Sequence, residues 1–219
     1  MPPADDTAPD AGTPTPSCGR GVGDRGLAVL ARHRRTLVIA LALFVLTGVI
    51  ELMLGRSLLG PDGRFGLWEG SIWSSACSQR LADPYSFSHI AHGMVFYALL
   101  WFVGRRIPVP TRFLMAVALE AGWEILENSP LIIERYRQVT IALGYEGDSV
   151  LNSLSDVVMM AIGFWIALRL PVWGTVALLL AMEIGCAVWI RDNLTLNVIM
   201  LVHPVEAIKA WQMAGRPAG

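Results

Sequence analysis

The chain has 219 residues, of which 54% are hydrophobic and only 16% are charged. Ordinary globular domains carry about 25% charged residues, so this composition excludes a typical water-soluble fold. The formal net charge of −1 leaves no basic excess to neutralise a phosphate backbone, which argues against nucleic-acid binding. The three cysteines, Cys18, Cys77 and Cys186, lack metal-ligand spacing and cannot all pair; whether Cys77 pairs with Cys186 stays open. The sequence predicts a polytopic membrane protein.

The first 26 residues are rich in Pro and Gly and contain few apolar side chains. Such a segment cannot offset the entropy cost of ordering, so we predict a disordered cytoplasmic tail over 1–26 and a single transmembrane domain over 27–219. The second region contains apolar stretches of about 20 residues, the length at which a helix crosses roughly 30 Å of hydrocarbon. The predicted spans are 36–54, 85–104, 113–133, 150–168, 172–190 and, less regular, 194–211. The predicted fold class is an all-α membrane bundle of five or six transmembrane helices.

The distribution of arginine and lysine predicts the orientation, because short cytoplasmic segments retain these residues. With six spans, 11 positively charged residues lie on the side of the N terminus and six lie on the other side. We therefore predict a multi-pass protein of the bacterial inner membrane with a cytoplasmic N terminus. The long first loop then faces outward, and its tryptophans favour an interfacial helix near residues 67–80.

Polar side chains inside the predicted spans are unusual, because a charge near the bilayer centre costs about 2.5 to 3.5 kcal/mol. On spans two, three and four these residues fall on one helical stripe each. A rise of about 1.5 Å per residue also places titratable groups from four spans at one level, roughly 9 to 13 Å below the outer boundary. The polar residues are His89, His92, Glu120, Glu124, Glu127, Asn152, Ser155, Asp156 and Glu183. We expect spans two to five to enclose an outward-facing polar cavity.

The candidate catalytic residues in this cavity are His89, His92, Glu124, Glu127 and Asp156. One interpretation is a divalent metal site with His89, His92, Glu127 and Asp156 as ligands, since imidazole and carboxylate groups suit such ions. A second is proton handling by carboxylates beside histidines. A third is general acid and base catalysis on a lipid-linked substrate. The structural alternative is hydrogen bonding between helices, worth on average about 0.6 kcal/mol per contact.

A second polar group lies on the outer side, after span three and at the end of span five. Arginine is well suited to bidentate recognition of phosphate or carboxylate. The candidate substrate-binding residues are Arg137, Asp148, Asn152, Arg191 and Asp192. The alternative is that the arginines contact lipid headgroups or nearby acids. Glu51 lies near a predicted helix end, and we expect its side chain to reach water.

Four strings resemble an uncharacterised bacterial family of inner-membrane proteins, a family or domain of unknown function. The resemblance covers about residues 66–212 and implies a bacterial cell membrane and several spans, without an activity. The strings are Tyr85-Ser-Phe-Ser-His89-Ile-Ala-His92-Gly, Trp123-Glu124-Ile-Leu-Glu127-Asn128-Ser-Pro130, Gly147-Asp148-Ser-Val-Leu-Asn152-Ser-Leu-Ser-Asp156, and Arg191-Asp192-Asn193-Leu-Thr.

A more distant resemblance is to VanZ-like membrane proteins, some of which are linked to glycopeptide-antibiotic resistance. It rests on the order of a His-bearing helix, a Glu-bearing helix, an Arg, and an Asp-x-x-x-Asn sequence that opens the next helix. The sequence departs from that pattern at Ser155, where Gly is expected, and at the additional Asp156. The residues that the resemblance would assign are His89, Glu124, Arg137, Asp148 and Asn152.

These observations predict an integral inner-membrane protein that binds or processes an envelope lipid or glycan precursor. A proton- or cation-coupled transporter is disfavoured, because no internal repeat is evident and the polar layer lies on one side of the membrane. A non-catalytic structural role is the other alternative. Membrane lipids are the expected partners, a divalent metal is the only cofactor that the residues suggest, and the sequence leaves open whether the protein is an enzyme.

Overall fold

The computed structural model describes residues 23–217, with side chains from residue 34 onward. The chain divides into two units, 1–35 and 36–219, and the packing reported below is that of the second unit. Of the predicted tail over 1–26, residues 1–22 lie outside the described residues. Residues 23–26 belong to the first helix, which begins at Gly23. The regular elements of the described part are eight α-helices and no strand, so the predicted all-α class is confirmed.

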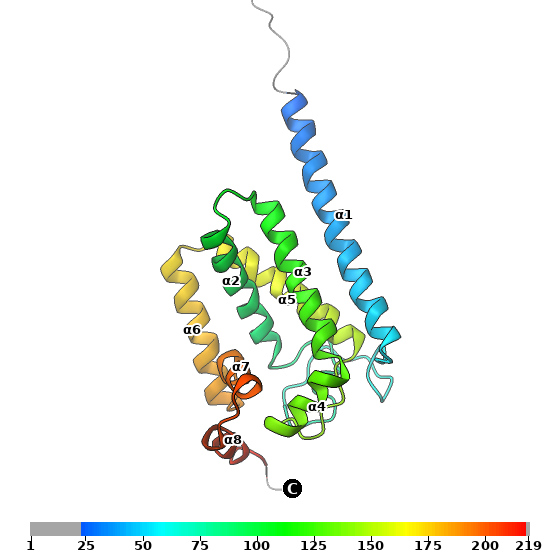
Figure 1. The fold of residues 1–219 in the computed structure, drawn as a ribbon, viewed down its shortest axis with the longest axis vertical. Coiled ribbons are helices and arrows are strands. Elements are labelled where there is room, and N and C mark those ends of the chain that lie inside the picture. Colours follow the sequence, from blue (N-terminus) through cyan, green and yellow to red (C-terminus); the bar gives the residue numbers. More distant parts are fainter. Residues whose placement is uncertain (1–22, 218–219) are drawn as a thin grey trace, which may run out of the picture. The chain divides into compact units, whose positions relative to one another are not determined.

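Four of the helices are long and apolar enough to cross a membrane: α1 over Arg34–Met53, α2, α5 and α6. α3 has a similar length, but it carries Arg112 and three glutamates. The helices, in chain order (Figure 1), are α1 Gly23–Met53, α2 Ser86–Val103, α3 Val109–Glu127, α4 Pro130–Val139, α5 Val150–Arg169, α6 Val172–Trp189, α7 Leu194–Val202 and α8 Glu206–Met213.

The structure differs from the sequence prediction at three segments: the third span, the possible sixth span and the interfacial helix. The third span ends at Glu127 and not at residue 133, because Pro130 has no backbone N–H to continue the helix and instead begins α4. The sixth span divides at Pro204 into α7 and α8, each of which extends less than about 15 Å and cannot cross about 30 Å of hydrocarbon. Residues 67–80 form turns and no helix.

The break in the sixth segment also changes the count of positive residues. Lys209 donates to the backbone oxygen of Gln138 in α4 at 2.8 Å, and the guanidinium of Arg216 lies over the Trp73 ring of the first loop. Both residues therefore lie at the end of the bundle that the six-span prediction placed outside. Moving these two residues changes the count from 11 and six to nine and eight.

The helices α2 and α5 make the most extensive interhelical contact, and two glycines permit it. A Cβ atom added to Gly93 would lie 1.9 Å from the backbone oxygen of Met160, and one added to Gly163 would lie 1.9 Å from that of Ile90. The two backbones therefore touch, which no residue with a side chain would allow at these positions. This contact places the His-bearing stripe of α2 against the polar first turns of α5.

An apolar core fills the opposite half of the α2, α3 and α5 interface. Its centre is Phe164, which meets the rings of Tyr97 and Phe113 edge-on, with centroids 5.2 and 5.4 Å away. Close packing of such large side chains makes the centre of this half apolar. The buried residues of the core are Leu100, Ala116, Val117, Val157, Met160 and Phe164.

The C-terminal part of α1 packs against α5 near Gly48, where an added Cβ would lie 3.3 Å from Leu154. This contact buries Glu51 completely. Our prediction that Glu51 reaches water is therefore wrong: the helix end is covered by its neighbour, and among the described residues neither carboxylate oxygen has a hydrogen-bond partner. Cys77 and Cys186 are free thiols, while Cys18 lies outside the described residues.

Candidate functional site

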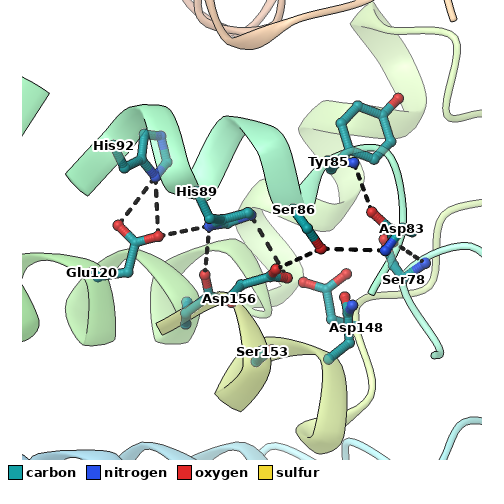
Figure 2. Close-up of polar contacts among 12 residues, drawn as sticks. Ser78, Asp83, Tyr85, Ser86, His89, His92, Glu120, Asp148, Ser153 and Asp156 are labelled. Atoms are coloured by element: carbon teal, nitrogen blue, oxygen red, sulfur yellow. Dashed lines mark hydrogen bonds and ion pairs between the residues drawn. The ribbon is translucent and has the colours of Figure 1, made fainter. Parts of the chain in front are cut away.

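A buried carboxylate, Glu120 of α3, lies between the two histidines of α2 (Figure 2). His89 Nδ1 lies 2.6 Å from Glu120 Oε1, and His92 Nδ1 lies 3.1 Å from both oxygens of the same group. Helical spacing explains the geometry, since residues three apart on α2 project from one face. The result is a His–Glu–His arrangement in which one carboxylate orients two imidazole rings.

His89 is also surrounded by two further carboxylates. Its Nδ1 lies 3.3 Å from Glu124 Oε1, and its Nε2 lies 3.7 Å from Asp156 Oδ2. Asp156 is held in turn by Ser86, whose hydroxyl donates to Oδ1 at 3.2 Å. Glu120 and Glu124 have no exposed surface, so the layer joins acids of α3 and α5 to a histidine of α2 in the interior of the bundle.

A cavity of about 820 Å³ opens beside this layer, and its wall combines polar and aromatic side chains. His89, His92 and Glu127 contribute titratable groups. The aromatic part includes the rings of Phe96 and Trp123. Both rings contact His92: Phe96 stacks on it with ring centroids 5.6 Å apart, and Trp123 meets it edge-on. Such a wall suits a ligand that has both an apolar and a polar part. Further lining residues come from the first loop, α4, the 140–146 segment and α7.

The entry to α2 is held by Asp83, which precedes the predicted membrane region. Its carboxylate accepts hydrogen bonds from the backbone N–H groups of Ser78 and Tyr85, at 2.8 and 2.7 Å. Burial raises the pKa of Asp83 above its usual value, and these hydrogen bonds partly oppose the rise. Asp83 thereby ties the first loop to the helix that carries both histidines.

A second network joins Asp148, Asn128 and Ser153. The Asn128 side chain donates to Asp148 Oδ2 at 3.2 Å and to Ser153 Oγ at 3.0 Å, and it accepts the backbone N–H of Asp148 at 2.7 Å. Burial raises the pKa of Asp148 to about 6. Asn152 donates to the backbone oxygen of Arg80 at 2.9 Å. Asp148 and Asn152 therefore connect the start of α5 to neighbouring segments, and neither lines the cavity.

Asp192 lines the cavity, but protein groups already engage its carboxylate. Oδ1 accepts from the Asn193 backbone N–H at 2.9 Å and from Gln212 at 3.0 Å, and Oδ2 accepts from the Tyr85 hydroxyl at 3.2 Å. Burial raises the pKa of Asp192 to about 6, and the hydrogen bonds act in the opposite direction. The carboxylate thus joins α2 to α8 beside the cavity.

The structure brings some predicted residues together and separates others. Glu127 lies on the cavity wall with His89 and His92, whereas Arg137 donates to the backbone oxygen of Tyr145, and Arg191 donates to that of Trp211. Neither arginine lines the cavity. Glu183 accepts the backbone N–H groups of Leu194 and Thr195, so it caps α7 and does not join the polar layer. The outer arginines therefore hold backbone carbonyls.

The comparisons with known proteins identify a family. The family described as "Protein of unknown function (DUF2585)" matches residues 51–214, which include every helix from α2 to α8. The chain belongs to this family. The predicted membership of an uncharacterised bacterial family is thereby confirmed.

The relatives of this DUF2585 chain are UPF0314 proteins of other bacteria. One from Sphingopyxis alaskensis is 52% identical over 180 residues, which cover 81% of this chain and 95% of that protein. One from Rhizobium etli strain CIAT 652 is 51% identical over 182 residues, with 83% and 93% covered. One from Paracoccus denitrificans is 49% identical over 170 residues, with 78% and 88% covered. No solved structure matches the chain.

Our sequence reasoning omitted Glu120 from the candidate site, although this residue lies at its centre. The available signal was its position one helical turn before Glu124 on the same stripe of α3. Glu120 lies one helical turn deeper in the predicted span than Glu124. The residue is central because α2 packs against α3 with both histidines at its level, which the periodicity of one helix cannot reveal.

Proposed function

We propose that this DUF2585 protein is an integral protein of the bacterial inner membrane that binds the polar head of an envelope lipid or lipid-linked glycan precursor. Four helices have the length and apolarity to cross a membrane. α3, which packs against both α2 and α5, would be the fifth span. The observation that carries the proposal is the cavity, because it places a buried histidine–carboxylate layer next to an aromatic wall.

The division of the wall supports an amphiphilic ligand. Phe96, Leu119 and Trp123 offer apolar surface for a chain, while His92 and Glu127 offer polar contacts for a headgroup. A phosphate or sugar hydroxyl group would accept or donate hydrogen bonds at these two residues. A wall with an aromatic part and a separate polar part matches a ligand with an apolar chain and a polar head, which supports a lipid as the occupant.

His92 is the residue best placed to exchange a proton with such a ligand. Its Nδ1 faces Glu120, which would hold the proton on that nitrogen and leave Nε2 as the acceptor. The carboxylate would also stabilise the imidazolium that forms when Nε2 takes a proton, as in other histidine–carboxylate pairs. The arrangement supports general-base chemistry at the headgroup.

Transport across the membrane is less well supported. The half of the bundle away from the cavity is filled by Leu100, Met160 and Phe164. The charged residue buried there, Arg112, lies over the Tyr97 ring and points to no polar pathway among the described residues. A ligand that entered the cavity would leave by the same side.

Lipid retention tests the binding proposal. We expect native mass spectrometry of the detergent-purified protein to show a bound lipid, and His92→Gln to weaken lipid affinity about fivefold, the loss of roughly 1 kcal/mol that one hydrogen bond contributes, with a matching fall in the bound fraction. The matched control is His203→Gln at an exposed position away from the cavity, which should retain the lipid. Equal retention by all three proteins, or no bound lipid in the wild type, would refute the proposal.

Orientation is tested separately, with Cys77 and Cys186 replaced. In the proposed five-span arrangement the N terminus is cytoplasmic and the cavity faces outward, so an impermeant thiol reagent should label Gly144→Cys and Ala214→Cys in intact spheroplasts. Thr111→Cys, at the start of α3, should react only after permeabilisation. All three positions are exposed. Labelling of Thr111→Cys from outside would reverse the orientation.

A further inference from the structure

Glu124 is the least satisfied group in the polar layer. Its side chain has no exposed surface, and among the described residues neither carboxylate oxygen has a hydrogen-bond partner. The nearest cationic group is His89, whose Nδ1 lies 3.3 Å from Oε1 but is already hydrogen-bonded to Glu120 at 2.6 Å. A buried carboxylate without partners is strongly unfavourable unless it is protonated or neutralised by a cation, so this position suits a further positive group.

The atoms around Glu124 have the spacing of metal ligands. One ligand atom each from His89, Glu124 and Glu127 can be chosen so that all lie within 4.8 Å of one another. Two ligands bound at about 2.1 Å to one tetrahedral ion are separated by about 3.4 Å, close to the 3.3 Å between His89 and Glu124. Only small side-chain movements would bring the three groups around one ion.

The surroundings of His89 also fit a ligand histidine. Metal-bound histidines usually direct their second ring nitrogen toward a carboxylate, which sets the ring orientation. Here Nδ1 faces Glu120 and Nε2 faces Asp156, at 2.6 and 3.7 Å. Whichever nitrogen binds an ion, the other has a carboxylate partner.

A competing set, His89 with His92 and Glu120, has similar spacing. The two sets differ in how well their carboxylates are satisfied. Both oxygens of Glu120 already interact with imidazole nitrogens, whereas those of Glu124 have no partner. An ion at the first set would displace the hydrogen bonds of both histidines to Glu120, whereas an ion held by His89 Nδ1 and Glu124 would displace only that of His89 and would supply the contact that Glu124 lacks.

We propose that His89, Glu124 and Glu127 bind a divalent first-row transition metal ion. One imidazole and two carboxylates suit ions such as Zn²⁺, Mn²⁺ or Fe²⁺. His89 and Glu127 line the cavity, so a remaining coordination position would face the ligand space. The set replaces His92 and Asp156 of the sequence prediction with Glu124, and it does not depend on lipid binding.

Cobalt titration tests the site directly, because Co²⁺ in a protein site with nitrogen and oxygen ligands gives visible d–d absorption. The purified, chelator-treated full chain in detergent should bind one Co²⁺ with a visible spectrum. Glu124→Gln and Glu127→Gln should each weaken Co²⁺ binding at least about 100-fold, since even outer-partner changes cost 10- to 100-fold. His92→Gln and the exposed control Glu206→Gln should bind as the wild type does.

Size-exclusion profiles show which variants fold. If Glu124→Gln does not fold, Glu127→Gln provides the test. Absence of stoichiometric Co²⁺ binding to the wild type overturns the proposal. So does wild-type affinity in a folded Glu124→Gln or Glu127→Gln protein, or loss of binding in His92→Gln alone, which would assign the metal to the competing set. Lipid retention is scored separately on the same preparations, so failure of the metal site is distinguishable from failure of the proposed function.

Discussion

The two halves of the α2, α3 and α5 interface are built by the same helices, but one half consists of apolar side chains and the other of polar side chains. One half is an apolar core around Met160 and Phe164, and the other is a layer of two histidines and several acids around Glu120. The apolar half already provides a packed contact between all three helices. The polar layer is therefore not needed to hold them together, which favours a role in binding or chemistry over a purely structural one.

The contact between Gly93 and Gly163 connects the two halves. Gly93 is four residues beyond His89 on α2, and Gly163 is seven residues beyond Asp156 on α5. The close approach of these backbones determines how far the His89 ring lies from the acids. Changes at the glycines should therefore affect both halves, whereas changes on either side should affect only one.

The largest effect is expected from Gly163→Ala. The added methyl group would lie 1.9 Å from the Ile90 backbone oxygen, so the helices would have to separate. We expect loss of the monodisperse size-exclusion peak. The control is Gly122→Ala on α3, where nothing lies within 4 Å of the added atom. A folded Gly163→Ala protein with the wild-type Tm would show that the α2–α5 contact is wrong.

Phe164→Ala should weaken the apolar half alone. Truncation of a buried Phe leaves a cavity and costs about 3 to 5 kcal/mol, which should lower Tm by several degrees. Lipid retention by the fraction that remains folded should not change, because Phe164 does not line the cavity. The same truncation at Phe102, which is 72% exposed, serves as the control. Selective loss of the lipid from folded Phe164→Ala protein would contradict the separation of the two halves.

Asp192→Asn should alter the pH dependence of stability. Because burial raises the pKa of Asp192 to about 6, the folded state holds a proton that the unfolded state releases above about pH 4. Stability contributed by this group is therefore lost as pH rises from about 4 to 6. The neutral variant should show a smaller decline in Tm over that range and a gain of about 3 kcal/mol at pH 7.5, since one pKa unit corresponds to about 1.4 kcal/mol.

The matched control for that measurement is Asp62→Asn. Arg80 lowers the pKa of the exposed Asp62 to about 2, so this group stays charged in both states across most of the range. Its removal should leave the decline between pH 4 and 7 unchanged. A decline in Asp192→Asn as steep as in the wild type would mean that Asp192 does not hold a proton in the folded state.

Glu51→Gln is expected to have the smallest effect. It replaces a buried carboxyl group that has no hydrogen-bond partner among the described residues, while it retains the side-chain shape. We expect a Tm equal to or a few degrees above that of the wild type, measured by nanoscale fluorimetry, with lipid retention unchanged. Glu206→Gln, at an exposed site, should leave Tm within about one degree. A large fall in Tm would show that the charge of Glu51 is paired.

The sequence predicted the ends of α5 and α6 within a residue, because both are apolar stretches bounded by turn residues or proline. It also identified the stripe of α2 through His89 and His92, since the helical period determines which residues share a face. The helix ends at Glu127 and Val202 were missed, because average apolarity over 20 residues does not register one proline.

The partners of the candidate residues were harder to predict. Glu120, Glu51 and the engaged arginines depend on which helix lies opposite and at what level, and that information arises only from tertiary packing. Arg137 and Arg191 have the chemistry for anion recognition, yet backbone carbonyls of Tyr145 and Trp211 occupy them. Residue type identified the candidates, and the contacts show which of them lie together.

The central claim is that a lipid occupies the cavity beside His92, and a photoactivatable, clickable phospholipid tests it most directly. After irradiation of the protein in lipid nanodiscs, peptide mapping should find adducts on the cavity-lining residues of α2 and α3 and on the 140–146 segment. His92→Gln should reduce the yield of these adducts, while the yield of adducts on the outer face of α6 should stay unchanged. Adducts confined to outer helix faces, with equal yield in wild type and His92→Gln, would contradict the account.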